Sequence, residues 1–173
     1  TGKAVPAIIA ALTKGHSGQS LRLASCWALL AKVAPAERAK PMKDHLFDPA
    51  NFKTPMMVPT LGRKSADYDG KGGGYWKGSV WIPTNTMVVK GLLEYGYLAE
   101  AREIASNGLE GMFQTWKKTG TLFENYDQEK PEAPGGSSKA DFVGWTGVQP
   151  IATLIHAKAS NTHSTRTPEL SAI

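Results

Sequence analysis

Apolar residues recur at intervals of three and four positions in several parts of the chain, and this spacing predicts helices. Leu23, Trp27 and Leu30 fall on one face of a short helix. A second helix is predicted from about Ala36 to Leu46, even though Pro41 lies inside it and proline disfavours a helix interior. The two helices are predicted to be a pair joined by a short turn.

The middle of the chain predicts a helix from Asn85 to Tyr95. Pro83 suits the first turn of this helix, and Gly96 can end it. Two weaker helical patterns lie outside this region, a final helix over Trp145 to Ala157 and a short one over Val5 to Thr13. The predicted helices therefore cover most of the chain apart from two long loops.

The clearest helical pattern runs from Leu98 to Trp116. Glutamates lie near its start and lysines near its end, which matches the helix dipole, and Gly120 follows the last turn. Gly108 and Gly111 interrupt the apolar positions of this segment. Small residues inside a helix predict that another helix approaches closely there.

Two long segments, 51–79 and 121–141, show no helical period and are rich in glycine and proline. Compact domains seldom contain irregular connections of this length unless the loops are functional or disordered. No segment of strand length alternates between apolar and polar residues. The sequence therefore predicts an all-α fold with long Gly-rich loops.

Composition and charge exclude several classes of protein. Of the 173 residues, 41% are hydrophobic, which is enough to bury a core, and no apolar run is long enough to span a membrane. The net charge of +5 comes from scattered residues, so a solvated surface is predicted in place of nucleic-acid binding. The single cysteine, Cys26, excludes an internal disulfide framework and is predicted to be a small buried hydrophobe; it leaves the compartment open.

Common cofactor and metal motifs are absent from the sequence. The glycines at 70–74 match neither the P-loop spacing nor the dinucleotide fingerprint, and the four histidines form no H-x-x-x-H pair. The G-x-S-x-G motif of many hydrolases is also missing. The sequence predicts no cofactor and no metal site.

Three segments combine aromatic residues with carboxylates. They are GYWKGSVWIPTN at 74–85, LFENYD at 122–127 and DFVGWTG at 141–147. A sugar ring stacks its C–H face on a flat aromatic ring while its hydroxyls bond to polar groups at the edge. The alternative is that the tryptophans fill a hydrophobic core and that Glu124 is an ordinary surface residue.

In order and spacing, these segments resemble the C-terminal half of glycoside hydrolase family 63, over most of the chain from about Leu23 to His156. The first segment is similar to the family's G-Y-W-[RK]-G-x-[VI]-W-x-P-x-N pattern, the second to its x-x-E-x-Y-[DN] pattern and the third to its F-x-G-W-[TS] pattern. The trehalases of family 37 share a related layout, so the resemblance extends to the clan.

The resemblance implies an (α/α)6 barrel and an inverting α-glycosidase of the α-glucosidase or α-mannosidase type, acting on an oligosaccharide or a small glycoside. Glu124 corresponds to the general base of the family. Tyr75 and Trp76 correspond to residues that line the substrate pocket, and Trp81 and Trp145 are their expected neighbours. Enzymes of this kind use two carboxyl groups, one to protonate the leaving group and one to activate water.

The general acid of the family is an aspartate well upstream of the segment at 74–85. Only Asp44, Asp48, Asp67 and Asp69 precede that segment here, and none has a matching context. Twelve barrel helices of ~11 residues with their loops need at least ~300 residues, and about six helices are predicted. We therefore expect residues 1–159 to be the C-terminal part of a barrel, holding about half of its helical hairpins, and 160–173 to be a frayed polar tail.

Three explanations fit an absent acid: a fragment of a longer protein, a chain whose other half lies elsewhere, or a truncated product without catalysis. The expected partners are a substrate sugar and the missing N-terminal half of the barrel or another chain, with no nucleic acid and no membrane. A non-catalytic sugar-binding or scaffold module is the alternative function. A nucleic-acid binder would rest only on the pI near 9.3.

Overall fold

The described residues of the computed structural model form helices and loops. They are residues 23–72, 74–147, 150, 151 and 154. The elements are a 3₁₀ helix η1 (Leu23–Cys26) and the α-helices α2 (Trp27–Leu30), α3 (Ala36–Leu46), α4 (Ile82–Glu94) and α5 (Leu98–Thr119). Within these residues, extended pairing is limited to isolated bridges, so the predicted all-α class is confirmed.

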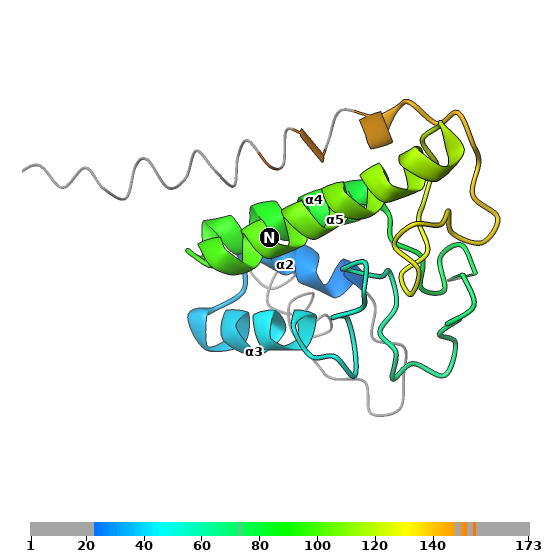
Figure 1. Cartoon of the computed structure of the whole chain (residues 1–173). Helices are drawn as coiled ribbons and strands as arrows, with labels where there is room; N and C mark the ends of the chain where they lie inside the picture. Colours follow the sequence, from blue (N-terminus) through cyan, green and yellow to red (C-terminus); the bar gives the residue numbers. More distant parts are fainter. Residues whose placement is uncertain (1–22, 73, 148–149, 152–153, 155–173) are drawn as a thin grey trace, which may run out of the picture.

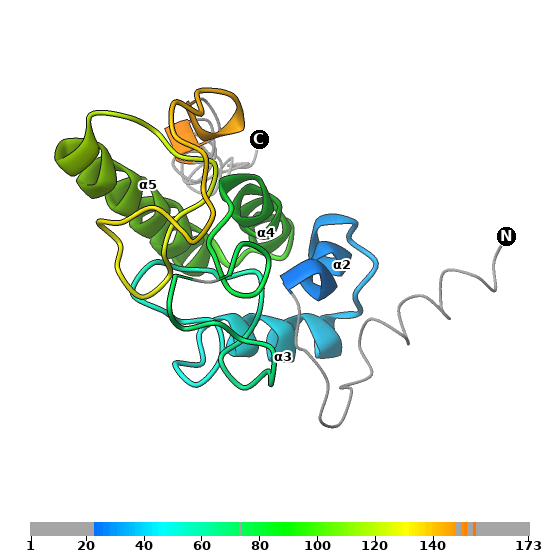
Figure 2. The ribbon, with the colours of Figure 1, turned by 90° about the vertical axis from the view of Figure 1, so that its right-hand side faces the viewer.

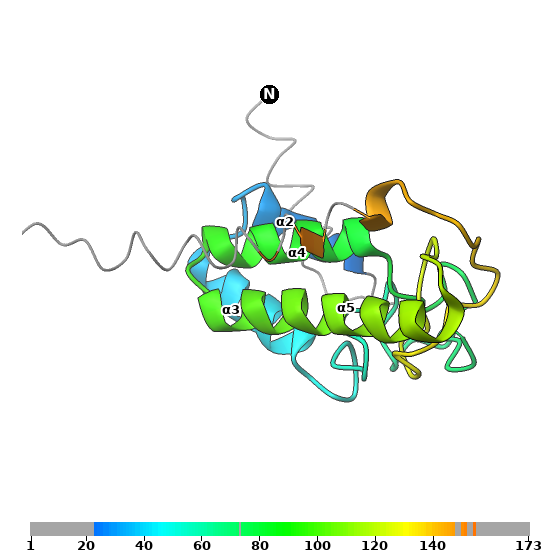
Figure 3. The same cartoon turned by 45° about the horizontal axis from the view of Figure 1, so that its top comes forward.

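The helices α4 and α5 lie side by side as an antiparallel hairpin, and α2 packs against the other side of α4 (Figures 1 and 3). The loops between α3 and α4 and after α5 gather at one end of this hairpin, which faces the viewer in Figure 2. The N-terminus of α4 and the C-terminus of α5 both lie at that end. Segments far apart in the sequence are therefore brought together there.

Two apolar clusters support this arrangement. The larger one joins α2, α3, α4 and α5 through fully buried side chains such as Leu29, Leu46 and Leu92. The smaller one lies under the long loops and consists of Met56, Val80, Ile82, Met112 and Tyr126. The second cluster matters for the site, because it anchors both long loops to the hairpin.

The helix α4 begins at Ile82, three residues before the predicted start, and ends with Tyr95 as its C-cap. Pro83 occupies the first turn as predicted, where its missing N–H leaves no hydrogen bond unmade. The helix α5 ends as predicted at Gly120, whose φ of 74° is left-handed.

The close approach of a neighbouring helix to Gly108 and Gly111 was predicted wrongly. Among the described residues, a Cβ atom at Gly108 would meet nothing within 4 Å, and one at Gly111 would meet the flexible side chain of Met56 in a loop. The close helix crossing lies instead at Gly91 of α4. A Cβ there would lie 2.8 Å from both the Cβ of Leu29 and the backbone nitrogen of Leu30 in α2.

Replacing Gly91 with alanine is expected to lower the free energy of unfolding by about 1–3 kcal/mol, because α2 would have to shift away from α4. The matched control is Gly108→Ala, which should raise the free energy of unfolding by up to about 1 kcal/mol, since the new methyl group meets no atom of the described residues within 4 Å and alanine favours the helix. Urea unfolding followed by circular dichroism measures both. Equal effects of the two variants would contradict the assigned crossing.

The predicted apolar face of the first helix is also wrong. Trp27 and Leu30 are 43% and 36% exposed, whereas Leu29 is fully buried. The reason is that Leu23–Cys26 form a 3₁₀ helix, whose tighter winding takes Leu23 out of the register of the α-helix that follows. Cys26 is buried as predicted, and burial raises the pKa of its thiol to about 12.

Of the remaining helical predictions, some are confirmed and others fall on residues that the structure does not describe. The helix α3 has the predicted bounds and tolerates Pro41. In the final predicted helix, residues 145–147, 150–151 and 154 are helical. The predicted helix at 5–13 and the predicted domain boundary after residue 159 lie outside the described residues. Among the residues that are described, no helix has the length and hydropathy needed to cross a bilayer.

Candidate functional site

A short antiparallel bridge joins the two long loops. The N–H of Val80 donates to the carbonyl of Tyr126 at 2.9 Å, and the N–H of Tyr126 donates back to the carbonyl of Val80 at 3.0 Å. Both side chains are fully buried in the smaller apolar cluster. This pairing fixes the segment at 74–85 beside the segment at 122–127.

The glycines of the two loops meet at a second point. The N–H of Gly136 donates to the carbonyl of Gly72 at 2.6 Å, and a Cβ at Gly72 would lie 3.3 Å from the backbone nitrogen of Gly136. Gly72 also has a φ of 94°, which a residue with a side chain rarely adopts. The close backbone contact and the positive φ explain why glycines are found at these positions.

The aromatic residues of the first segment pack on one another directly before α4. Trp76 stacks on Trp81 with ring centroids 3.9 Å apart and planes inclined by 9°. Tyr75 meets Trp81 edge-on at 4.7 Å, and its carbonyl accepts a hydrogen bond of 3.2 Å from Nε1 of Trp81. Trp81 is buried, whereas Trp76 is 47% exposed and presents part of its indole to solvent.

Trp145 joins this group from the start of the last helical segment. Its ring centroid lies 6.2 Å from that of Trp81 and 4.8 Å from that of Phe142. The neighbouring Thr146 is buried, and its Oγ1 donates to the carbonyl of Phe123 at 3.0 Å. The third aromatic segment is therefore attached to the segment that carries Glu124.

Glu124 is buried, with 6% of its surface exposed. Its backbone N–H donates to the carbonyl of Lys139 at 2.9 Å. Its Oε1 accepts a hydrogen bond of 3.2 Å from the hydroxyl of Tyr75, while its Oε2 has no hydrogen-bond partner in the described part of the chain. Burial, together with the charge of Glu124, raises the pKa of Tyr75, so its hydroxyl remains a donor at neutral pH.

The structure thus brings together all five residues singled out from the sequence. We call Tyr75, Trp76, Trp81, Glu124 and Trp145 the aromatic–carboxylate cluster. The alternative of a surface Glu124 is wrong, since the side chain is buried, whereas Trp81 does fill space inside the protein. Their roles in catalysis or binding stay predictions.

Sequence reasoning missed an ion pair that ties the two loops together. Both Nε and Nη2 of Arg63 donate to the carboxylate of Glu129, and the hydroxyl of Tyr68 donates to Oε1 of the same residue at 2.6 Å. The partners lie more than 60 positions apart, so no local pattern points to them. Glu129 lies in the same loop as Glu124, five residues further along, so this ion pair fixes the loop that carries Glu124.

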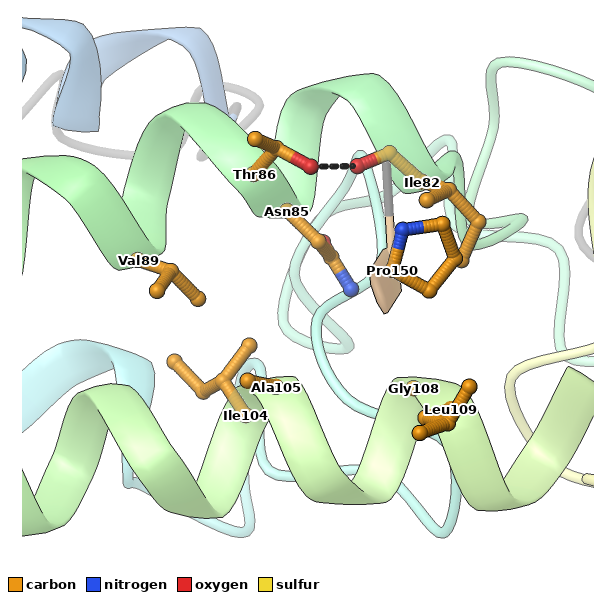
Figure 4. A pocket seen from close by; sticks show the side chains of 9 residues that line it. All are labelled: Ile82, Asn85, Thr86, Val89, Ile104, Ala105, Gly108, Leu109 and Pro150. Atoms are coloured by element: carbon orange, nitrogen blue, oxygen red, sulfur yellow. Dashed lines mark hydrogen bonds between the residues drawn. The ribbon is translucent and has the colours of Figure 1, made fainter. Parts of the chain in front are cut away.

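A separate hollow lies between α4 and α5 (Figure 4). Its walls are mainly apolar, with Asn85 and Thr86 as the polar residues, and Pro150 closes one side. Thr86 uses its hydroxyl to bond to the carbonyl of Ile82 in its own helix. Glu124 and the tryptophans do not line this hollow, so it is distinct from the aromatic–carboxylate cluster.

Metal-ligating residues do not gather at the cluster. Over the described ranges, no group of three or more histidine, cysteine, aspartate or glutamate side chains could hold a metal ion. The aromatic–carboxylate cluster instead offers a hydrogen-bonded carboxylate next to aromatic rings. The carboxylate suits proton transfer, and the rings suit stacking of a sugar ring.

Comparisons with known proteins show which family the chain resembles. The profile of the mannosylglycerate hydrolase MGH1-like glycoside hydrolase domain matches residues 8–146. A probable mannosyl-oligosaccharide glucosidase of Schizosaccharomyces pombe is 31% identical over 91 residues, which are 47% of this chain and 11% of that protein. The mannosyl-oligosaccharide glucosidase of Saccharomyces cerevisiae is 23% identical over 146 residues, 77% of this chain and 17% of that protein.

The fold of this chain is similar to part of several solved structures. The GH63 mannosylglycerate hydrolase of Thermus thermophilus, in complex with glucose, matches with a TM-score of 0.60 and 23% identity. The match covers 79% of this chain and 31% of that one. The chain therefore spans about a third of the solved relative and a smaller share of the curated relatives.

Proposed function

The chain belongs to the family of mannosylglycerate hydrolase MGH1-like glycoside hydrolases, and we propose from this that it is the base-carrying part of an inverting α-glycosidase. It would contribute about half of the helical hairpins of an (α/α)6 barrel, with the long loops on the rim around the substrate. The proposed substrates are α-glucosides or α-mannosides, which suit the names of the relatives.

The observation that carries this proposal is the state of Glu124. The carboxylate has Oε1 bonded to Tyr75 and a buried Oε2 with no partner among the described residues, so Oε2 can accept a proton from a water molecule that reaches it in the completed barrel. In an inverting mechanism this water attacks the anomeric carbon from the face opposite the leaving group. The surrounding aromatic side chains would exclude other water and present flat faces to the sugar ring.

The general acid is proposed to come from outside this chain. A general acid needs a carboxyl group that stays protonated near neutral pH. Hydrogen bonds from Lys40 and Lys43 lower the pKa of Asp44 to about 2, and the backbone N–H of Ala50 lowers that of Asp48. Neither Asp44 nor Asp48 is therefore suited to donate a proton, and the proposal places the acid in the part of the relatives that this chain does not span.

Exposed apolar side chains on the helices support the proposal that another part of the barrel packs against them. Trp27 and Leu30 on α2 are exposed, and so is Ile151 in the last helical segment. Such side chains are expected to be covered when the rest of the barrel is present. We therefore expect the 18.6 kDa chain alone to self-associate in sedimentation velocity; a stable compact monomer would contradict this.

Replacing Trp76 with alanine is expected to weaken binding of a sugar ligand by about 1–3 kcal/mol, because the exposed indole face would be lost. The matched control is Trp116→Ala on α5, since Trp116 is 48% exposed against 47% for Trp76. The completed protein is this chain joined to the acid-bearing part of the barrel. Isothermal titration of it with glucose measures the affinity of both variants.

Equal affinity losses in the two variants would remove Trp76 from the proposed sugar site. The alternative function, a non-catalytic sugar-binding module, predicts the same loss of affinity at Trp76 but no hydrolysis. A panel of α-glucosides and α-mannosylglycerate, incubated with the completed protein, separates the two functions.

A further inference from the structure

The hydroxyl of Tyr75 contacts one oxygen of Glu124 and not the other. It donates to Oε1 at 3.2 Å, although the two residues are 49 positions apart. The second oxygen, Oε2, is buried and accepts no hydrogen bond from the residues that the structure describes. One oxygen of the carboxylate is therefore occupied by a donor, and the other keeps its lone pairs.

The position of Tyr75 is imposed by its surroundings. Its φ of 65° lies in the left-handed region, which a bulky side chain seldom adopts. The backbone carbonyl is held by Nε1 of Trp81, and the ring packs edge-on against Trp76 and Trp81. Unfavourable backbone conformations persist where neighbouring contacts enforce them, and they concentrate at functional sites.

The other side of the pair is fixed as well. The backbone N–H of Glu124 is bonded to the carbonyl of Lys139, and the next N–H, of Asn125, donates to Oγ of Ser138 at 2.9 Å. The bridge between Val80 and Tyr126 sets the separation of the two loops. Among the residues that the structure describes, the hydrogen bond from Tyr75 to Oε1 is then the contact that orients the carboxylate.

We propose that Tyr75 is a positioning residue for the general base, and that its hydroxyl holds Oε1 so that Oε2 takes the proton. This inference rests on the proposed function. As the water oxygen bonds to the anomeric carbon, Oε2 receives one proton of that water and the bond to the leaving oxygen breaks. The leaving oxygen is protonated by the carboxylic acid of the rest of the barrel, so glycoside and water give a free sugar and an alcohol.

The pairing is tested in the chain itself, without any hydrolysis. Glu124→Gln removes the charge beside Tyr75, so the pKa of Tyr75 is expected to fall. The measurement is a titration of ¹³Cζ-labelled tyrosines by NMR, with circular dichroism to verify folding. The matched control is Glu129→Gln, which should shift the titration of Tyr68 and leave that of Tyr75 unchanged.

A second measurement is made at neutral pH, so it does not require the protein to stay folded at the high pH of a tyrosine titration. Tyr75→Phe should move the ¹³Cδ resonance of Glu124 and leave that of Glu129 in place. If Tyr75 titrates identically with and without the charge of Glu124, or if this resonance stays unmoved, the inference is overturned whatever the hydrolysis assay shows.

The role in catalysis is tested by kinetics of the completed protein on an α-glucoside. Tyr75→Phe is expected to lower kcat by about 10- to 100-fold with little change in KM, because the variant loses the hydroxyl and keeps the aromatic ring. A higher KM with unchanged kcat would make Tyr75 a wall of the pocket and overturn the positioning role. Absence of hydrolysis in the unmodified protein would instead overturn the proposed function, while the titration still decides whether the pair forms.

Discussion

Replacing Glu124 with glutamine in the completed protein is expected to lower kcat by about 10²- to 10⁴-fold, the range that general base catalysis contributes. Glutamine keeps the shape and can still accept the hydrogen bond from Tyr75, but it cannot take a proton from water. Sugar affinity, measured by isothermal titration, should therefore stay close to that of the unmodified protein.

The control for this substitution is Glu132→Gln. Glu132 lies in the same loop, but its carboxylate forms an ion pair with the exposed Lys118 at 3.3 Å. It should leave kcat unchanged. Full activity in Glu124→Gln would remove the residue from the role of base, and a large loss of sugar affinity would mean that it holds the substrate.

Trp81→Ala is expected to lower the free energy of unfolding by about 3–5 kcal/mol, because a large buried side chain is replaced by a cavity. Trp81 is 2% exposed, contacts Tyr75, Trp76 and Trp145, and is the residue before α4. The loss should also separate the aromatic rings from Glu124, since Nε1 no longer holds the carbonyl of Tyr75.

Chemical unfolding of the chain in urea measures this prediction, with Trp116→Ala as the control. The indole of Trp116 is about half exposed on α5, and its removal should cost less than about 1 kcal/mol. If both substitutions destabilise the chain equally, Trp81 does not support the site as described.

The helices could be predicted from the sequence because the apolar periodicity agrees with the residues that favour helix starts and ends. Gly120 ends α5 in a left-handed conformation, and Pro83 lies in the first turn of α4, as each residue type favours. The apolar face of α2 could not be predicted, because the switch from 3₁₀ to α winding at Cys26 depends on packing against α4. The same holds for the crossing at Gly91.

The aromatic–carboxylate cluster was predicted from three short segments, but its internal contacts were not. Which atom of Tyr75 reaches Glu124 depends on the bridge between Val80 and Tyr126 and on a positive φ, and neither leaves a pattern in the sequence. The ion pair of Arg63 with Glu129 is a contact between distant loops and was missed for the same reason.

The most direct test of the central claim is the anomer first released from an α-glucoside by the completed protein, followed by ¹H NMR before mutarotation. If Glu124 activates a water opposite the leaving group, the β-anomer appears first, and it disappears from the products in Glu124→Gln. An α-anomer as the first product would mean retention through a covalent intermediate, and it would contradict the role of Glu124 as the base of an inverting glycosidase.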